Sequence, residues 1–207
     1  MIDEAISEYR MVLNMNPDYA AEAHNSLGVA YFSKGMIGEA ISEYKQALVK
    51  DPECVEAHYN LGIAYSIRGM IDEAISEYKT VLDMNPDYAE AHNNLGVAYF
   101  SKEMIDEAIS EYKKELCHNS DFVKTHYNLG IAYFSKGMID EAISKYKTVL
   151  DMSPDYAEAH NNLAVAYFAK ECFDLAWKHV RIAQKSNNPP NIEFLKLLKK
   201  ASEMNQQ

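Results

Sequence analysis

Apolar residues along this chain recur at intervals of three and four, which is the spacing of one face of an α-helix. Within residues 55–68, for example, Leu61, Ala64 and Tyr65 share such a face, and Gly69 suits the left-handed residue that ends a helix. A second segment follows with Asp72 at its start, where the helix dipole favours a negative charge. The pattern predicts pairs of short amphipathic helices.

The predicted helix pairs repeat with a period of about 34 residues. A Leu followed by Gly or Ala recurs five times, a Tyr stands three positions further on, and an Ala follows in the second helix. Several independent positions therefore keep the same register five times. They are Leu27-Gly28, Leu61-Gly62, Leu95-Gly96, Leu129-Gly130 and Leu163-Ala164, then Tyr31, Tyr65, Tyr99, Tyr133 and Tyr167, then Ala40, Ala74, Ala108, Ala142 and Ala176, with Pro52, Pro86 and Pro154 closing three units.

This order of residues resembles the signature of the tetratricopeptide repeat over nearly the whole chain. The resemblance implies an all-α fold, a right-handed superhelical solenoid of stacked antiparallel helix pairs. One pair cannot bury its apolar stripe alone, whereas a stack of pairs buries a continuous core. The expected divisions are a half repeat holding only a second helix (1–20), five repeats (21–54, 55–88, 89–122, 123–156 and 157–190), and a C-terminal capping helix with its tail (191–207).

The ends of the predicted helices carry their own signals. Acidic pairs at capping-box spacing precede two of the first helices. The run Asn187-Asn188-Pro189-Pro190 breaks the chain ahead of an amphipathic segment at 192–200. The two expected capping boxes are Asp87 with Glu90 and Asp155 with Glu158.

In tetratricopeptide superhelices the concave wall is lined mainly by the first helix of each repeat. The resemblance places a row of amides and tyrosines there, beside aliphatic and phenyl groups. Amides can hydrogen-bond an extended peptide backbone, and exposed apolar rows mark binding surfaces. We therefore expect this groove to bind a peptide or an amphipathic helix of a partner protein. The expected binding residues are Asn60, Asn94, Asn128, Asn162, Tyr59, Asn93, Tyr127, Asn161, Val97, Ile131, Phe100, Phe134 and Phe168.

Each of these rows also has a purely structural interpretation. The Asn row is frequent in the family and can instead bond the neighbouring helix, and the Phe row can pack on the next first helix. Chaperone-binding members clamp a C-terminal carboxylate with Lys and Asn at set positions, which here hold Asn or Tyr and Val or Ile. A chaperone tail is therefore not the expected partner.

Charge and missing motifs exclude several function classes. The formal net charge of −11 and pI near 5.1 argue against nucleic acid and anionic membranes as partners. No nucleophile elbow, phosphate loop or zinc-protease motif is present, so we expect no enzyme activity and no cofactor. Five histidines recur once per repeat, too far apart to share a zinc ion, and are expected to pack. They are His24, His58, His92, His126 and His160.

The sequence favours a cytoplasmic location. The three cysteines, Cys54, Cys117 and Cys172, are widely spaced and form no disulfide framework. The first residues lack the basic and apolar regions of a signal peptide, and no run of about 20 apolar residues could insert in a membrane.

Two alternative functions remain open. A second helix without its first helix exposes an apolar stripe of Ile2, Ile6, Tyr9, Val12 and Leu13, which another copy of the chain could cover to form a homo-oligomeric scaffold. The repeats could also be a fragment of a longer enzyme or adaptor chain.

Repeat three departs from the others. Glu103 replaces the turn Gly, Glu115 stands where the others have Ala or Val, and Ser120 replaces Pro. The simpler interpretation is sequence drift with Glu115 reaching solvent. The alternative is a bend or looser joint between Glu115 and Asp121.

Overall fold

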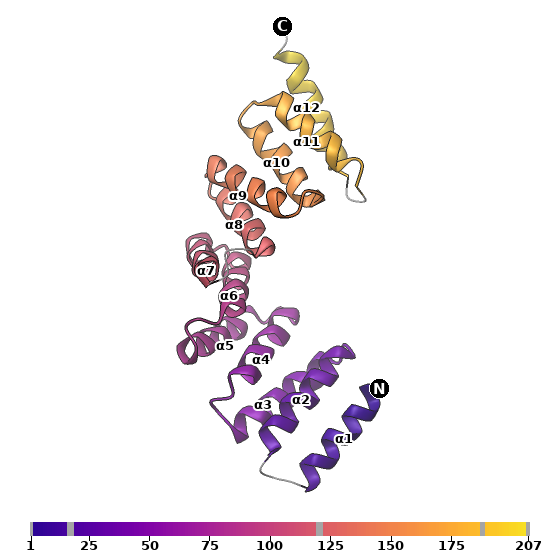
Figure 1. Ribbon diagram of the computed structural model, residues 1–207, viewed down its shortest axis with the longest axis vertical. Helices are drawn as coiled ribbons and strands as arrows, with labels where there is room; N and C mark the ends of the chain where they lie inside the picture. Colours follow the sequence, from indigo (N-terminus) through magenta and orange to yellow (C-terminus); the bar gives the residue numbers. More distant parts are fainter. Residues whose placement is uncertain (1, 16–18, 119–121, 187–188, 206–207) are drawn as a thin grey trace. The chain divides into compact units, whose positions relative to one another are not determined.

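The computed structural model describes residues 2–15, 19–118, 122–186 and 189–205, and within them the protein has twelve α-helices and no strand (Figure 1). The predicted all-α solenoid of stacked antiparallel helix pairs is confirmed. The chain separates into two compact units, Met1–Met104 and Ile105–Gln207. The boundary falls between the two helices of repeat three.

The first helix of the first unit, α1, has the sequence pattern of a second helix of a repeat. Helix α1 packs on the first helix of repeat one, and each later second helix packs both on its own first helix and on the next one. This arrangement buries one face of every helix. The helices are α1 (Ile2–Met15), α2 (Ala20–Ser33), α3 (Ile37–Lys50), α4 (Val55–Ile67), α5 (Ile71–Met84) and α6 (Ala89–Ser101).

The second unit repeats this packing, and its last described helix is α12. Helix α12 packs on α11, in the place that the first helix of a further repeat would take. The Asn191 side chain caps α12 by accepting a hydrogen bond from the Glu193 amide at 2.7 Å. The helices are α7 (Ile105–His118), α8 (Val123–Ser135), α9 (Ile139–Met152), α10 (Ala157–Ala169), α11 (Phe173–Ala183) and α12 (Ile192–Met204).

Within a repeat, a glycine of the first helix makes room for a tyrosine of the second. A Cβ atom on Gly62 would lie 2.7 Å from Cε1 of Tyr78, closer than atoms can approach. Gly28 with Tyr44 and Gly130 with Tyr146 show the same fit. The glycine therefore allows the two helices to approach and the ring to be fully buried.

The turn between the two helices of a repeat needs a left-handed residue. Gly35, Gly69 and Gly137 have φ of 74°, 72° and 80°, and the following amide returns to the first helix in each case. Glu103 and Glu171 adopt the same conformation with φ of 60° and 59°. The turn therefore has the same conformation where glutamate replaces glycine. The Cβ atom of the glutamate makes this left-handed conformation less favourable.

Asp87 and Asp155 are not at the N-cap positions that the expected capping boxes require, because each helix begins one residue later. The N-cap positions of α6 and α10 are Tyr88 and Tyr156, and neither makes a side-chain capping hydrogen bond. The Asp87 amide instead donates to the Asn85 side chain at 3.3 Å, within the turn before the helix.

Glu115 does not reach solvent, which corrects the simpler interpretation of repeat three. It is 1% exposed in the interface between α7 and α8, where its carboxylate accepts a hydrogen bond from the hydroxyl of fully buried Thr125. The other repeats pair two apolar residues at these positions, such as Val149 with Ala159. Ser120 and the rest of 119–121 lie outside the described residues, as do Asn187 and Asn188.

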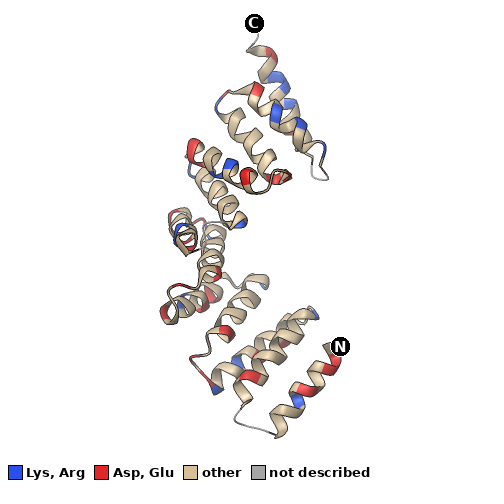
Figure 2. Ribbon diagram, in the orientation of Figure 1, with Lys and Arg blue, Asp and Glu red and all other residues tan. Residues whose placement is uncertain are grey.

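Lysines at the ends of first helices form ion pairs with aspartates at the start of the preceding second helices. Figure 2 shows basic and acidic positions interspersed along the ribbon. The aspartate side chains are largely exposed, so each pair adds little stability. Between repeats one and two both residues differ: Arg68 stands at the lysine position and lies beside Gly38, which stands at the aspartate position. The pairs are Lys34 with Asp3, Lys102 with Asp72, Lys136 with Asp106 and Lys170 with Asp140.

Candidate protein-binding surfaces

The amide row lies on the first helices, and several of its members donate to a side chain of the preceding first helix. Asn60 donates to the Asn25 side chain at 3.1 Å, and Asn94 donates to the Tyr59 hydroxyl at the same distance. In the second unit Asn162 donates to the Tyr127 hydroxyl at 3.1 Å. These bonds match the structural interpretation of the row. Apart from buried Asn93, the predicted amides are half-buried, so they still border solvent.

Two tyrosines of the row form aromatic clusters. The Tyr59 ring lies 5.0 Å from Tyr88 and 6.2 Å from Tyr78, centroid to centroid. Tyr127 contacts Tyr156 and Tyr146 in the same way at 5.2 and 6.1 Å. Burial raises the pKa of Tyr59 to about 12, so its hydroxyl stays neutral and keeps a proton to donate.

The aliphatic row is the part of the predicted surface that is open to solvent. Val29 and Val97 are 44% and 40% exposed, whereas Ile131 is half-buried. Phe100 and Phe134 are half-buried as well. The exposed valines therefore give the first helices an apolar strip beside the amides and tyrosines.

Phe168 packs inside the second unit. Its ring lies 6.0 Å from Phe173 and makes an edge contact at 5.7 Å with Phe194 of the capping helix. Phe168 therefore packs against its neighbours, as in the structural interpretation of the Phe row, at the position next to α12.

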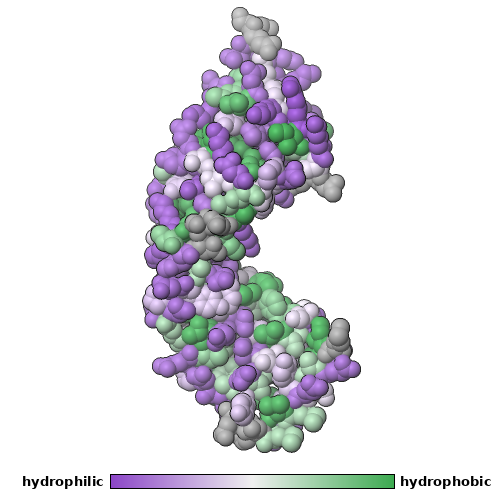
Figure 3. Space-filling view, in the orientation of Figure 1, coloured by the Kyte–Doolittle hydropathy of each residue, from purple (hydrophilic) through white to green (hydrophobic). Residues whose placement is uncertain are grey.

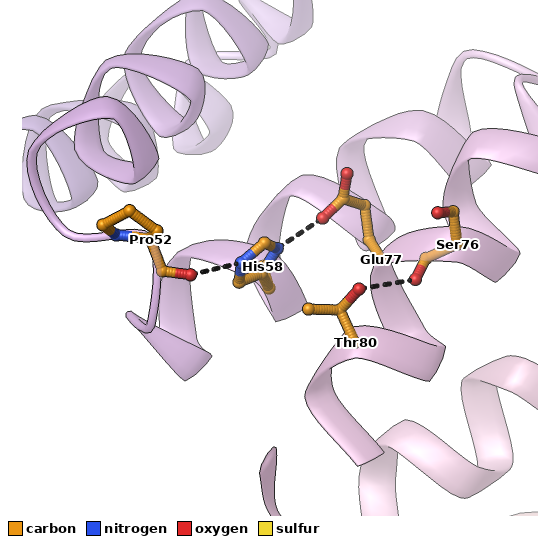
Figure 4. A network of polar contacts seen from close by, with 5 residues as sticks. All are labelled: Pro52, His58, Ser76, Glu77 and Thr80. Carbon is orange, nitrogen blue, oxygen red and sulfur yellow. Dashed lines mark hydrogen bonds and ion pairs between the residues drawn. The ribbon is translucent and has the colours of Figure 1, made fainter. Parts of the chain in front are cut away.

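The repeated histidines tie each first helix to its surroundings. His58 Nδ1 lies 2.5 Å from Glu77 Oε2, and Nε2 lies 3.0 Å from the carbonyl oxygen of Pro52 (Figure 4). Both partners are acceptors, so only the doubly protonated ring can donate to both at once. His24 with Glu43 repeats the carboxylate contact at 2.7 Å. Among the described residues no cluster of His, Cys, Asp or Glu could hold a metal ion.

The last repeat replaces this carboxylate with a second histidine. His160 Nδ1 lies 2.9 Å from His179 Nδ1, with ring centroids 5.2 Å apart. Burial, with the nearby His160 ring adding to it, lowers the pKa of His179 to about 4. One of the two rings must therefore accept the hydrogen bond in its neutral form.

The predicted self-association stripe on α1 is divided between two faces. Ile6 is buried, and so unavailable, while Ile2 and Val12 are exposed and Tyr9 and Leu13 are half-buried. Tyr9 and Val12 of the stripe line an open hollow of about 620 Å³ between α1 and α2. Figure 3 shows apolar residues reaching the surface among the N-terminal helices at the bottom of the view.

Sequence reasoning did not find the other apolar residues of this hollow. Met11, Met15 and Tyr19 line it and are 57%, 78% and 57% exposed. The sequence signal that could have revealed them is the close match of α1 to α5, a second helix that packs on its own first helix, α4. A further hollow of about 910 Å³ lies at the other end, beside Trp177, whose ring nitrogen donates to the Ser202 hydroxyl at 3.0 Å.

Among the described helices, none has the length and apolar character that crossing a membrane requires.

Solved structures with the same fold support this description. MamA is 29% identical, with a TM-score of 0.76 over 81% of this chain and 91% of that one. YrrB, described as a TPR protein with an unusual peptide-binding site, is 22% identical, with a TM-score of 0.75 over 86% of this chain and 91% of that one. PilF of Pseudomonas aeruginosa is 18% identical, with a TM-score of 0.76 over 91% and 86%.

No protein of curated function matches the chain significantly. The sequence profile of the TPR repeat matches residues 28–66, 64–103 and 130–170, which together cover more than half of the chain. These matches agree with the recurring Leu-Gly and Tyr positions and with the helix pairs that they build. The chain therefore belongs to the tetratricopeptide-repeat family.

Proposed function

We propose that this protein is a non-catalytic interaction module that binds a peptide or helix of a partner protein on the first helices of its repeats. The TPR fold typically serves protein interaction and not catalysis. The observation that supports this surface is the pair of exposed valines, Val29 and Val97, beside half-buried amides and tyrosines. Apolar side chains of a ligand can pack on the valines while the polar groups meet its backbone.

The exposed valines are better test residues than the half-buried phenylalanines of the same surface. Replacing half-buried Phe100 or Phe134 with a charged residue is expected to destabilise the fold. Val29 and Val97 already face solvent, so the same replacement there leaves the core intact. Val49 on α3 is 70% exposed and lies outside the proposed surface, so Val49→Glu is a matched control.

The experiment is affinity capture from the native cell extract, read by mass spectrometry. We expect a protein held by the wild type and by Val49→Glu to be lost from the Val29→Glu/Val97→Glu variant, with all three equally helical by circular dichroism. Equal capture by all three folded chains would contradict the proposed surface.

A further inference from the structure

The first helices of the first unit carry negative charge and no positive charge. Helices α2, α4 and α6 each hold one glutamate in the first turn, and no lysine or arginine lies within their bounds. These glutamates are Glu22, Glu56 and Glu90, and all three are exposed. Within the described part of the chain, no salt bridge involves any of them.

The helix dipole favours a negative charge at a helix start, but the fold does not require one at Glu56. Repeats two and four are near copies, and Lys124 takes the position of Glu56 in repeat four. Helix α8 nevertheless begins at Val123, the equivalent of Val55, and is as long as α4. Either charge is therefore compatible with the helix, and helix stability alone does not explain the acidic row.

Two of the glutamates line a hollow between the starts of α2 and α4. The hollow has a volume of about 470 Å³, and its polar lining combines Glu22 and Glu56 with Asp51 and the amide of Asn25. None of the described residues that line it is basic. Carboxylates gathered around one hollow repel one another, so a positively charged group placed there is attracted by all of them.

Glu56 also lies near an aromatic pair at the start of repeat three. The rings of Tyr59 and Tyr88 are 5.0 Å apart, centroid to centroid. Burial raises the pKa of the Tyr88 hydroxyl, and the nearby carboxylates of Glu90 and Glu56 raise it further. Aromatic rings beside carboxylates suit the side chain of lysine or arginine, which binds to both.

The apolar part of the proposed surface is most open on the same unit. The exposed valines Val29 and Val97 lie on α2 and α6. Their equivalents in the second unit, Ile131 and Val165, are half-buried, and Lys124 interrupts the row of glutamates there. Exposed apolar groups and unopposed carboxylates therefore occur together on the first unit.

We propose that the first helices of the first unit bind a peptide segment in which lysine or arginine stands beside apolar residues. This inference rests on the function proposed above and names the chemistry of the partner. The basic side chains meet Glu22, Glu56 and Glu90, while the apolar ones pack on Val29 and Val97. Glu56 is the central contact, because it borders both the hollow and the tyrosine pair.

A random library of short peptides displayed on phage, selected on the full chain, is the probe. We expect the selected peptides to be enriched in lysine and arginine and to be lost from Glu56→Lys, which introduces the residue of repeat four. Glu73→Lys is the matched control, because it makes the same change in the first turn of a second helix, at an exposed position. The two variants have the same net charge, so bulk attraction cannot account for a difference between them.

A selected peptide, synthesised with a fluorescent label, gives the size of the effect. In fluorescence anisotropy Glu56→Lys should weaken its binding at least about tenfold, because like charges then meet in the complex. Glu73→Lys should change the dissociation constant by less than about twofold. Circular dichroism checks that both variants are as helical as the wild type.

The outcomes separate this inference from the proposed function. Val29→Asn/Val97→Asn removes the apolar contacts without changing the charge, and it should also weaken binding. Peptides lost from this variant but not enriched in basic residues, or bound equally by Glu56→Lys, would overturn the basic partner and leave the proposed function standing. No enrichment, or equal binding by Val29→Asn/Val97→Asn, would overturn the first-helix surface and this inference with it.

Discussion

At the residue scale, the size of one side chain is matched by that of its partner. Gly130 leaves room for Tyr146, and in the last repeat Ala164 and Val180 take the equivalent positions, both completely buried. A larger residue on the first helix thus coincides with a smaller one on the second. Such matching keeps the interior filled without strain.

Glu115 and Thr125 form a polar substitute for an apolar pair. Thr125→Ala should destabilise the fold by about 1–3 kcal/mol, because it removes a hydrogen bond from a buried carboxylate. The double variant Glu115→Val/Thr125→Ala recreates the pair of Val149 and Ala159 and should be as stable as the wild type, or up to about 4 kcal/mol more stable. Urea unfolding measures both. A double variant less stable than Thr125→Ala would contradict this account.

The pairing of His160 with His179 predicts acid sensitivity. Because the folded pKa of His179, about 4, lies below the 6.5 of a free histidine, the unfolded chain binds the proton more readily. The contribution to stability is complete above pH 6.5 and is lost as pH falls towards 4. Allowing for partial exposure, the loss is on the order of 1–2 kcal/mol.

His179→Glu restores the histidine–carboxylate contact seen between His58 and Glu77. Thermal unfolding monitored by circular dichroism should show a smaller decrease in Tm between pH 7 and pH 5 than in the wild type. Identical pH profiles for the two proteins would assign the acid sensitivity to other groups.

At the element scale, the packing of the two helices fixes the conformation of the turn between them. It does so even where the central residue is not glycine and would prefer a negative φ. Met104 and Cys172 donate to the carbonyls of Tyr99 and Tyr167 with the geometry found in glycine-containing turns. The helices on both sides are anchored by their buried faces. Packing therefore imposes a left-handed conformation on Glu103 and Glu171.

Glu103→Gly and Glu171→Gly should each relieve this strain. Each should stabilise the protein by about 1 kcal/mol, the left-handed penalty of a Cβ atom less the extra chain entropy of glycine. Gly69→Ala, at a turn with φ of 72°, is the reverse control and should destabilise by a similar amount. Chemical unfolding of the three variants checks the signs, and destabilisation by Glu103→Gly would refute the explanation.

At the scale of the whole molecule, the excess of acidic residues and the acid-sensitive histidine act in the same pH range. The net charge of −11 at neutral pH disappears near the pI of 5.1. Self-repulsion is then lost, which favours association. We expect light scattering to rise near pH 5. His179→Glu should retain this rise while gaining resistance to unfolding. A scattering maximum that disappears with His179→Glu would instead make local unfolding its cause.

The fold was predictable because a sequence pattern that repeats indicates that the same packing between neighbouring helices repeats. Leu61, Gly62 and Tyr65 mark the first helix of repeat two, and these positions return with little change in the other repeats. The positions of the amide and aliphatic rows followed from the same register. Capping was not predictable from residue spacing, because whether Asp87 or Tyr88 starts the helix depends on how the turn from the preceding repeat closes.

The sequence by itself determined the helix pairs, their period and the residues of the core, because these depend on contacts between positions of fixed separation. Only the tertiary structure decided which polar side chains are hydrogen-bonded within the protein. It turned the Asn60 amide towards Asn25 and buried Glu115 against Thr125. Exposure and pairing depend on the neighbour that packs across each residue, and the residue's own identity does not specify that neighbour.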